Sequence, residues 1–137
     1  MKNKATILLI DDDVAFLRAL NIALTTHGYT VVGAGDPGAA MDYVLQRQQR
    51  FDVVITDVQM LVVDGLHVLA MIRQAFPGIP VIVISAFGRP TIREEAAQLG
   101  AFAYLDKPFS KQQIVALIEQ ATTETHHEPT PIHSRRG

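Results

Sequence analysis

A fivefold alternation of short apolar runs and amphipathic stretches constrains the fold of this chain more than any other feature. The apolar runs predict strands at Thr6–Ile10, Thr30–Ala34, Val53–Thr56, Val81–Ile84 and Ala101–Leu105. Apolar residues at helical spacing follow each run, and the clearest stripes are Phe16, Leu17, Leu20 and Leu24, and then Ile114, Leu117, Ile118 and Ala121. Strands and helices that alternate in this way are typical of a parallel sheet with helices on both faces. We therefore predict an α/β fold built from five βα units.

The strand order follows from how apolar each run is. The first, third and fourth runs read ILLI, VVIT and VIVI, so these strands should be central and covered on both faces. The second and fifth runs, TVVGA and AFAYL, are more mixed and should lie at the edges. This pattern predicts the order 2-1-3-4-5, which is the doubly wound, flavodoxin-like (βα)5 arrangement.

Local signals agree with these boundaries. Asp36 followed by Pro37 predicts an N-cap and a first-turn proline, and Ser110 should cap the fifth helix. Gly28 and Gly100 stand where the first and fourth helices should end.

Length and composition narrow the class of protein. A chain of 137 residues suits one domain that can bury a core without disulfides or a structural metal. The chain has no cysteine, which excludes disulfides, thiolate metal sites and cysteine catalysis and fits a cytoplasmic protein. A net charge of −2 gives no reason to expect direct contact with nucleic acid. The first apolar run is too short to span a membrane or to form a signal-peptide core, so no membrane contact is expected.

The C-terminal end of the sequence has a different character. The periodic pattern stops at about Thr122, so we expect a domain over residues 1–121 and a flexible tail or truncated linker over residues 122–137. His126, His127 and His133 lie in this stretch, and a polar tail explains them better than a metal site.

Acidic residues follow two strands that the predicted order makes neighbours. Asp11, Asp12 and Asp13 follow the first strand, and Asp57 follows the third. These two strands should lie about 4.8 Å apart, so their acids should converge. Two carboxylates about 4 Å apart repel by roughly 4 kcal/mol at an effective dielectric near 20, so a cation should lie among them. Oxygen ligands alone indicate a hard divalent cation, and Mg²⁺ fits two or three carboxylates and water. Asp13 should instead cap the first helix.

A hydroxyl and an ammonium should lie at the same edge of the sheet. The fourth strand ends at Ser85 and the fifth runs into Lys107. Together with a metal and carboxylates, these groups form a phosphoryl site. The metal and Lys107 neutralise phosphoryl oxygens, Ser85 donates a hydrogen bond, and one carboxylate is the nucleophile.

The motifs LLIDDD, ITDVQM…DG, VIVISA and AYLDKPF resemble the receiver domain of two-component response regulators, over about residues 5–121. The resemblance implies that Asp57 accepts a phosphoryl group from a sensor histidine kinase or phosphotransfer protein. It implies that Asp11 and Asp12 form the acidic pair, with Asp12 the more direct Mg²⁺ ligand, and that the backbone carbonyl of Gln59 completes the metal site. It also implies that Lys107 is the family's lysine, usually in a cis bond to Pro108.

The same resemblance implies a switch. Ser85 and Tyr104 match its hydroxyl and aromatic pair, and they alter the face of the fourth helix, fifth strand and fifth helix, where a homodimer is expected. Gln59 and Phe87 flank the approach of water to the phosphoryl group and should tune its lifetime. Leu61 departs from the family pattern, which usually has proline there.

A receiver of this kind is a signalling protein and not an enzyme, because the only reactions expected of it are its own phosphorylation and dephosphorylation. Two other functions are alternatives to this one. Asp11 and Asp13 also fit the Asp-x-Asp spacing of haloacid-dehalogenase-like phosphatases. Those enzymes carry a later acidic motif that VIVIS lacks, and they usually need a longer chain. A binding module independent of phosphorylation is disfavoured because every reactive position is filled.

Overall fold

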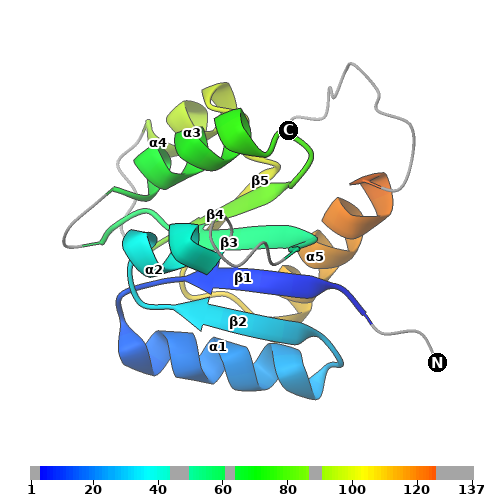
Figure 1. Cartoon of the computed structure of the whole chain (residues 1–137). Helices are drawn as coiled ribbons and strands as arrows, with labels where there is room; N and C mark the ends of the chain where they lie inside the picture. The colour runs from blue at the N-terminus through cyan, green and yellow to red at the C-terminus, as the bar shows by residue number, and fades with distance from the viewer. Residues whose placement is uncertain (1–3, 44–49, 61–63, 87–90, 126–137) are drawn as a thin grey trace.

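Five parallel strands form one sheet in the order β2-β1-β3-β4-β5, which confirms the predicted doubly wound arrangement (Figure 1). The computed structural model describes residues 4–43, 50–60, 64–86 and 91–125. The strands are β1 (Thr6–Ile10), β2 (Thr30–Ala34), β3 (Val53–Asp57), β4 (Val81–Ser85) and β5 (Ala103–Asp106). The helices are α1 (Val14–Thr26), α2 (Pro37–Met41), α3 (Gly65–Ala75), α4 (Ile92–Gln98) and α5 (Lys111–Thr125).

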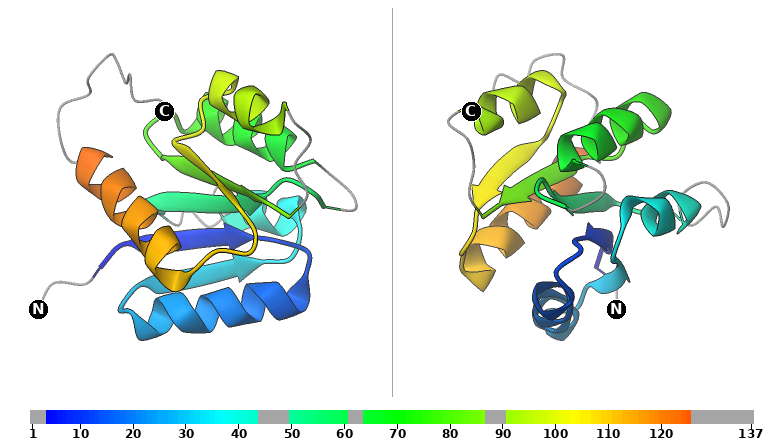
Figure 2. Two further views of the ribbon diagram at one scale, coloured as in Figure 1. Left: turned by 180° about the vertical axis from the view of Figure 1, so that it is seen from behind. Right: turned by 90° about the vertical axis from the view of Figure 1, so that its left-hand side faces the viewer.

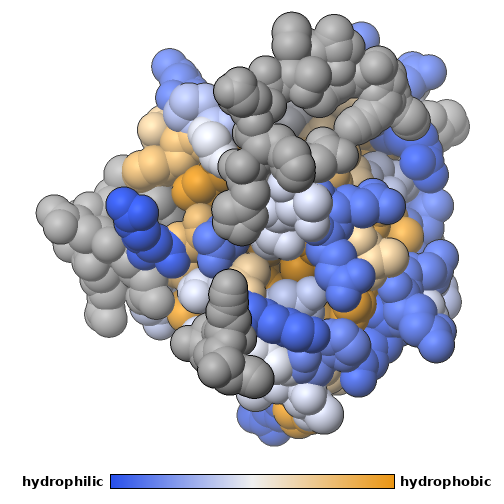
Figure 3. Space-filling view, turned by 90° about the vertical axis from the view of Figure 1, so that its right-hand side faces the viewer, coloured by the Kyte–Doolittle hydropathy of each residue, from blue (hydrophilic) through white to orange (hydrophobic). Residues whose placement is uncertain are grey.

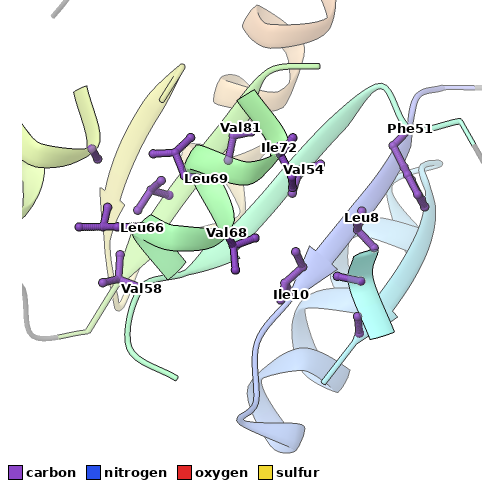
Figure 4. Close-up of a cluster of buried hydrophobic side chains, with 14 of the residues drawn as sticks. Leu8, Ile10, Phe51, Val54, Val58, Leu66, Val68, Leu69, Ile72 and Val81 are labelled. Atoms are coloured by element: carbon purple, nitrogen blue, oxygen red, sulfur yellow. The ribbon is translucent and has the colours of Figure 1, made fainter. Parts of the chain in front are cut away.

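Helices cover the sheet on both faces (Figure 2). Helices α2, α3 and α4 pack on one face, and α1 and α5 pack on the other. In the close-up of the first face, Leu69 and Ile72 of α3 lie over strands β3 and β4 (Figure 4). Every residue of β3 and β4 is buried, as expected for central strands with continuous apolar sequences. Among the described residues, no helix is both long enough and apolar enough to cross a bilayer.

The predicted caps are present. The Asp36 side chain accepts a hydrogen bond from the backbone N–H of Ala39 at 2.8 Å. Ser110 Oγ accepts one from the backbone N–H of Gln113 at 3.1 Å, and Gln113 Oε1 accepts one from the Ser110 N–H at 2.9 Å. This reciprocal pair is a capping box at the start of α5. Gly28 has a φ of +104°, which glycine adopts without strain and which ends α1 as predicted.

Four strand boundaries differ from the predicted ones, among them the end of β5, which lies at Asp106. Strands β3 and β4 each run one residue further, so the last residue of each lies in the sheet. Strand β5 begins at Ala103 because Gly100, at φ +95°, and Ala101 complete a turn after α4, with the Ala101 N–H donating to Ala96 O at 3.0 Å.

Helix α5 continues to Thr125, four residues past the end of its apolar stripe. The Thr122 hydroxyl donates to the backbone oxygen of Ile118 within this last stretch. Residues 126–137, which include the three tail histidines, lie outside the described residues.

The carboxyl ends of the strands form one edge of the sheet. The arrowheads of β1 and β2 point to the left in Figure 1, and the right-hand view of Figure 2 looks onto that edge. Ile10 pairs with Thr56, and Asp57 pairs with Ile84, so the ends of the three central strands are level. At the opposite end of the molecule, hydrophilic side chains surround smaller apolar areas (Figure 3).

Candidate functional site

Three carboxylates meet at this edge of the sheet. Asp11, Asp12 and Asp57 each offer one oxygen, and these oxygens lie within 4.8 Å of one another. Asp11 is 0% exposed and Asp57 is 4% exposed, whereas Asp12 is half-buried. Asp13 is exposed and accepts a hydrogen bond from the Phe16 N–H at 3.1 Å, so it caps α1 as predicted.

Lys107 reaches the acids from the loop after β5. Its Nζ donates a hydrogen bond to Asp11 Oδ2 at 3.0 Å and lies 3.7 Å from Asp57 Oδ1. The other oxygen of Asp11 accepts a hydrogen bond from the backbone N–H of Asp13 at 2.9 Å. Both oxygens of Asp11 therefore have hydrogen-bond partners within the protein. The bond between Lys107 and Pro108 is cis, as the resemblance implied.

Asp57 differs from Asp11 in this respect. Its Oδ1 is buried and has no hydrogen-bond partner among the residues that the structure describes. The pKa of its carboxyl is raised to about 6, first because burial disfavours the charged form and then because Asp11 is negative. The Lys107 ammonium and the backbone N–H of Gln59 act in the opposite direction and lower this pKa.

The three carboxylates fit a hard divalent cation. All the available ligand atoms are oxygens, one of them buried without a hydrogen bond, and their mutual repulsion would be relieved by positive charge. Gln59, which the resemblance placed in the metal site through its backbone carbonyl, lies two residues beyond Asp57 and has an exposed side chain.

Ser85 ends β4, and Tyr104 lies near it on β5, where it pairs with Val83. Ser85 is fully buried, and its Oγ lies 3.5 Å from Gln59 Oε1, a long contact for a hydrogen bond. The Tyr104 hydroxyl donates to Asp106 Oδ1 at 2.7 Å. The pKa of Tyr104 is raised, first by burial and then by this bond, whereas a hydrogen bond with Ser85 lowers it.

Sequence reasoning missed two neighbours of Tyr104. The Arg93 guanidinium lies 4.7 Å from the centre of the Tyr104 ring and 3.9 Å from Asp106 Oδ2. No motif indicated these contacts, because they depend on where the long, exposed side chain of Arg93 on α4 lies against β5. Phe87 and Leu61, which we expected to influence phosphoryl lifetime and loop structure, lie outside the described residues.

Gly65 is a further residue whose role the sequence did not reveal. It begins α3, and its backbone N–H donates to Val58 O at 2.8 Å. A Cβ at this position would overlap the backbone carbonyl of Asp57. The absence of a side chain therefore lets α3 pack directly against the strand end that carries Asp57. In the sequence, this glycine is the second residue of the DG pair in the motif ITDVQM…DG.

Comparisons with known proteins point to one family. A family profile described as "Response regulator receiver domain" matches residues 7–119. The transcriptional regulatory protein GlrR of Escherichia coli (strain K12) is 38% identical over 121 residues, which are 88% of this chain and 27% of that protein. The chain therefore spans about a quarter of the length of such curated relatives.

Solved structures agree with the sequence matches. A response regulator receiver domain protein from Clostridium thermocellum superposes with a TM-score of 0.85 at 29% identity, covering 90% of this chain and 98% of that one. The beryllofluoride-activated NtrC4 receiver domain dimer gives a TM-score of 0.81 at 28% identity, covering 88% and 98%.

Proposed function

The chain belongs to the response regulator receiver domain family, and from this premise we propose that Asp57 is its phosphoryl acceptor. The protein is a receiver domain of two-component response regulators, a signalling module. The proposed donor is a sensor histidine kinase or a phosphotransfer protein, as for receiver domains in general. The phosphatase and the phosphorylation-independent module receive no support from the comparisons.

The observation that carries this assignment is the state of the Asp57 side chain. Its Oδ1 is buried, faces the Lys107 ammonium at 3.7 Å and has no hydrogen-bond partner among the described residues. Asp11, by contrast, uses both oxygens in hydrogen bonds. A free lone pair next to a cation is what a carboxylate nucleophile requires.

The proposed transfer needs few protein groups. An Asp57 oxygen attacks the phosphorus, a new O–P bond forms, and the bond between phosphorus and the donor atom breaks, with its electron pair leaving on the donor. Lys107 neutralises a phosphoryl oxygen, and Ser85 donates a hydrogen bond to another. Mg²⁺ held by Asp11, Asp12, Asp57 and the Gln59 carbonyl would supply further charge neutralisation.

The proposed output is a change in the α4-β5-α5 face. Ser85 interacts with the Tyr104 hydroxyl and lowers its pKa, so a shift of Ser85 toward a phosphoryl group would remove this interaction from Tyr104. A homodimer through this face is proposed for the phosphorylated protein, and the NtrC4 receiver relative is described as a dimer in its activated form. We propose no direct contact of these residues with nucleic acid, given the net charge of −2.

Labelling with a small donor tests the assignment. The wild-type protein, Asp57→Asn and Asp36→Asn are incubated with acetyl phosphate and Mg²⁺, and the phosphorylated species are measured by intact-mass spectrometry. Asp36 is a matched control because it is an exposed carboxylate whose capping role asparagine fulfils. We expect one added phosphoryl group on the wild type and on Asp36→Asn, and none on Asp57→Asn. Full labelling of Asp57→Asn would refute the assignment.

A further inference from the structure

We propose that Phe16 is a positioning residue whose aromatic face holds the Lys107 ammonium at the acidic site. The proposal rests on the proposed function, because it concerns the lysine that would receive a phosphoryl oxygen. It assigns a role in the site to a side chain of α1 that carries no charge and no hydrogen-bonding group.

Three groups among the described residues lie close to the Lys107 ammonium. Its Nζ lies 3.9 Å from the centre of the Phe16 ring, 3.0 Å from Asp11 Oδ2 and 3.7 Å from Asp57 Oδ1. Cations within about 6 Å of a ring centre are attracted by its electron-rich face, and the attraction grows when water is excluded. The Lys107 side chain is only 15% exposed, so this ammonium is largely shielded from solvent.

The Phe16 ring is itself held in place. The backbone N–H of Phe16 donates to the Asp13 side chain, which fixes the first turn of α1. The ring packs against the Phe109 ring at 6.0 Å between centres, with an angle of 87° between the ring planes. Phe109 is two residues after Lys107, so the loop that carries the lysine also contacts the ring. Edge-to-face packing of this kind is a favourable aromatic geometry.

Carboxylates alone do not hold the lysine in every state of the site. Lysine is a flexible chain that ends in a point charge, and it can follow any nearby carboxylate. A divalent cation bound to the three acids would neutralise much of their attraction for Lys107. The attraction of the ring does not depend on the charge of those acids. Phe16 therefore keeps the ammonium next to Asp57 in the state that accepts the phosphoryl group.

A spectroscopic measurement without metal tests the contact itself. The face of an aromatic ring shifts the NMR signals of groups above it upfield. The chain has four lysines, so labelling of lysine ε-carbons gives few signals, and Lys107→Arg identifies the one from Lys107. Lys4, whose Nζ lies 5.2 Å from the centre of the Tyr29 ring, is an internal control.

We expect an upfield Lys107 signal in the wild type and in Phe16→Tyr, which keeps the ring. In Phe16→Leu the Lys107 shift should be lost while the Lys4 signal stays in place. Persistence of the Lys107 shift in Phe16→Leu would overturn the proposal.

Labelling rates test the consequence. With acetyl phosphate and Mg²⁺, Phe16→Leu should be labelled about fivefold more slowly than wild type, whereas Phe16→Tyr should retain the wild-type rate. Phe51→Leu is the matched control, because Phe51 is buried in the core on the other face of the sheet and the change costs packing without touching Lys107. Equal slowing in Phe51→Leu and Phe16→Leu would overturn the proposal. Absence of labelling in the wild type would instead refute the proposed function, and the NMR result would still decide the role of Phe16.

Discussion

Burial of the Asp57 carboxyl makes its charge unfavourable in the folded protein. Its pKa rises from 3.8 to about 6 on folding, so between these values the folded state binds more protons than the unfolded state. The stability of the metal-free protein should therefore fall as the pH rises from about 4 to about 6 and then level off. At pH 7, Asp57→Asn should be more stable than wild type by about 2 to 3 kcal/mol.

Urea unfolding in the presence of a chelator, at pH values from 4 to 8, measures this difference. The gap between Asp57→Asn and wild type should be small at pH 4 and should widen up to about pH 6. Addition of Mg²⁺ should narrow the gap by stabilising the wild type. A gap of constant size across this pH range would contradict the prediction.

Asp12 and Asp13 are adjacent in the sequence, but their replacement should affect Mg²⁺ binding differently. Asp12 contributes an oxygen to the cluster with Asp11 and Asp57, whereas Asp13 is exposed and caps α1. Titration with Mg²⁺ should therefore show a larger loss of affinity in Asp12→Ala than in Asp13→Ala. Asp13→Ala should instead lower the free energy of unfolding by about 1 kcal/mol through loss of the cap. The reverse order of Mg²⁺ affinities would mean that the two acids exchange these roles.

Sequence alone predicted the charged groups of the site because each follows a strand. Asp11, Asp57 and Lys107 meet because parallel strands present their carboxyl ends at one edge, and the apolar runs fix which strands are neighbours. The contacts of Phe16 with Lys107 and of Arg93 with Tyr104 were not predictable in this way. They depend on the rotamers of long side chains and on how helices sit against the sheet.

At the level of secondary structure, the start of α3 depends on a missing side chain. A Cβ on Gly65 would overlap the carbonyl of Asp57 and approach the backbone of Val58. Gly65→Ala should therefore push α3 away from β3, destabilise the fold by about 2 kcal/mol or more, and slow labelling of Asp57 by acetyl phosphate. Thermal unfolding and labelling rates measure the two effects.

Gly78→Ala is the control for that change. Gly78 lies in the turn before β4, and a Cβ there would meet no atom within 4 Å. This variant should match the wild type in labelling rate and unfold within about 0.5 kcal/mol of it. Equal stabilities and labelling rates of the two alanine variants would show that the close contact between α3 and Asp57 affects neither quantity.

Element boundaries were predicted where short-range signals fix them. The strands β1 and β2 begin and end at the predicted residues, because polar or glycine residues bound their apolar runs. The start of β5 was wrong by two residues, since Ala101 and Phe102 read as strand, but the Ala101 N–H bonds back to Ala96 O of α4 and β5 begins only at Ala103. The end of α5 was also missed, because residues 122–125 extend the helix without an apolar periodicity.

Over the whole molecule, the helices differ in how firmly they are held. Helix α3 has eleven residues and buries five of them, whereas α4 has seven and buries only Ile92 and Ala96. The α4 N-cap residue, Thr91, makes no side-chain capping bond and donates instead to Glu95 Oε2 at 2.9 Å. Fewer buried contacts and an uncapped end lower the free energy of local opening. Backbone amides of α4 should therefore exchange with solvent faster than those of α3.

This difference in stability between α3 and α4 also determines where the structural effect of phosphorylating Asp57 should appear. Tyr104 of β5 lies under the Arg93 side chain of α4 and is hydrogen-bonded to Ser85, so a movement of Ser85 reaches α4 through one aromatic ring. Because α4 is the most weakly held helix along this route, a phosphoryl mimic should change its exchange rate most. Hydrogen exchange with and without beryllofluoride and Mg²⁺ should show changes in α4, β5 and the start of α5. Asp57→Asn should show none, and changes confined to α1 and α2 would contradict this route.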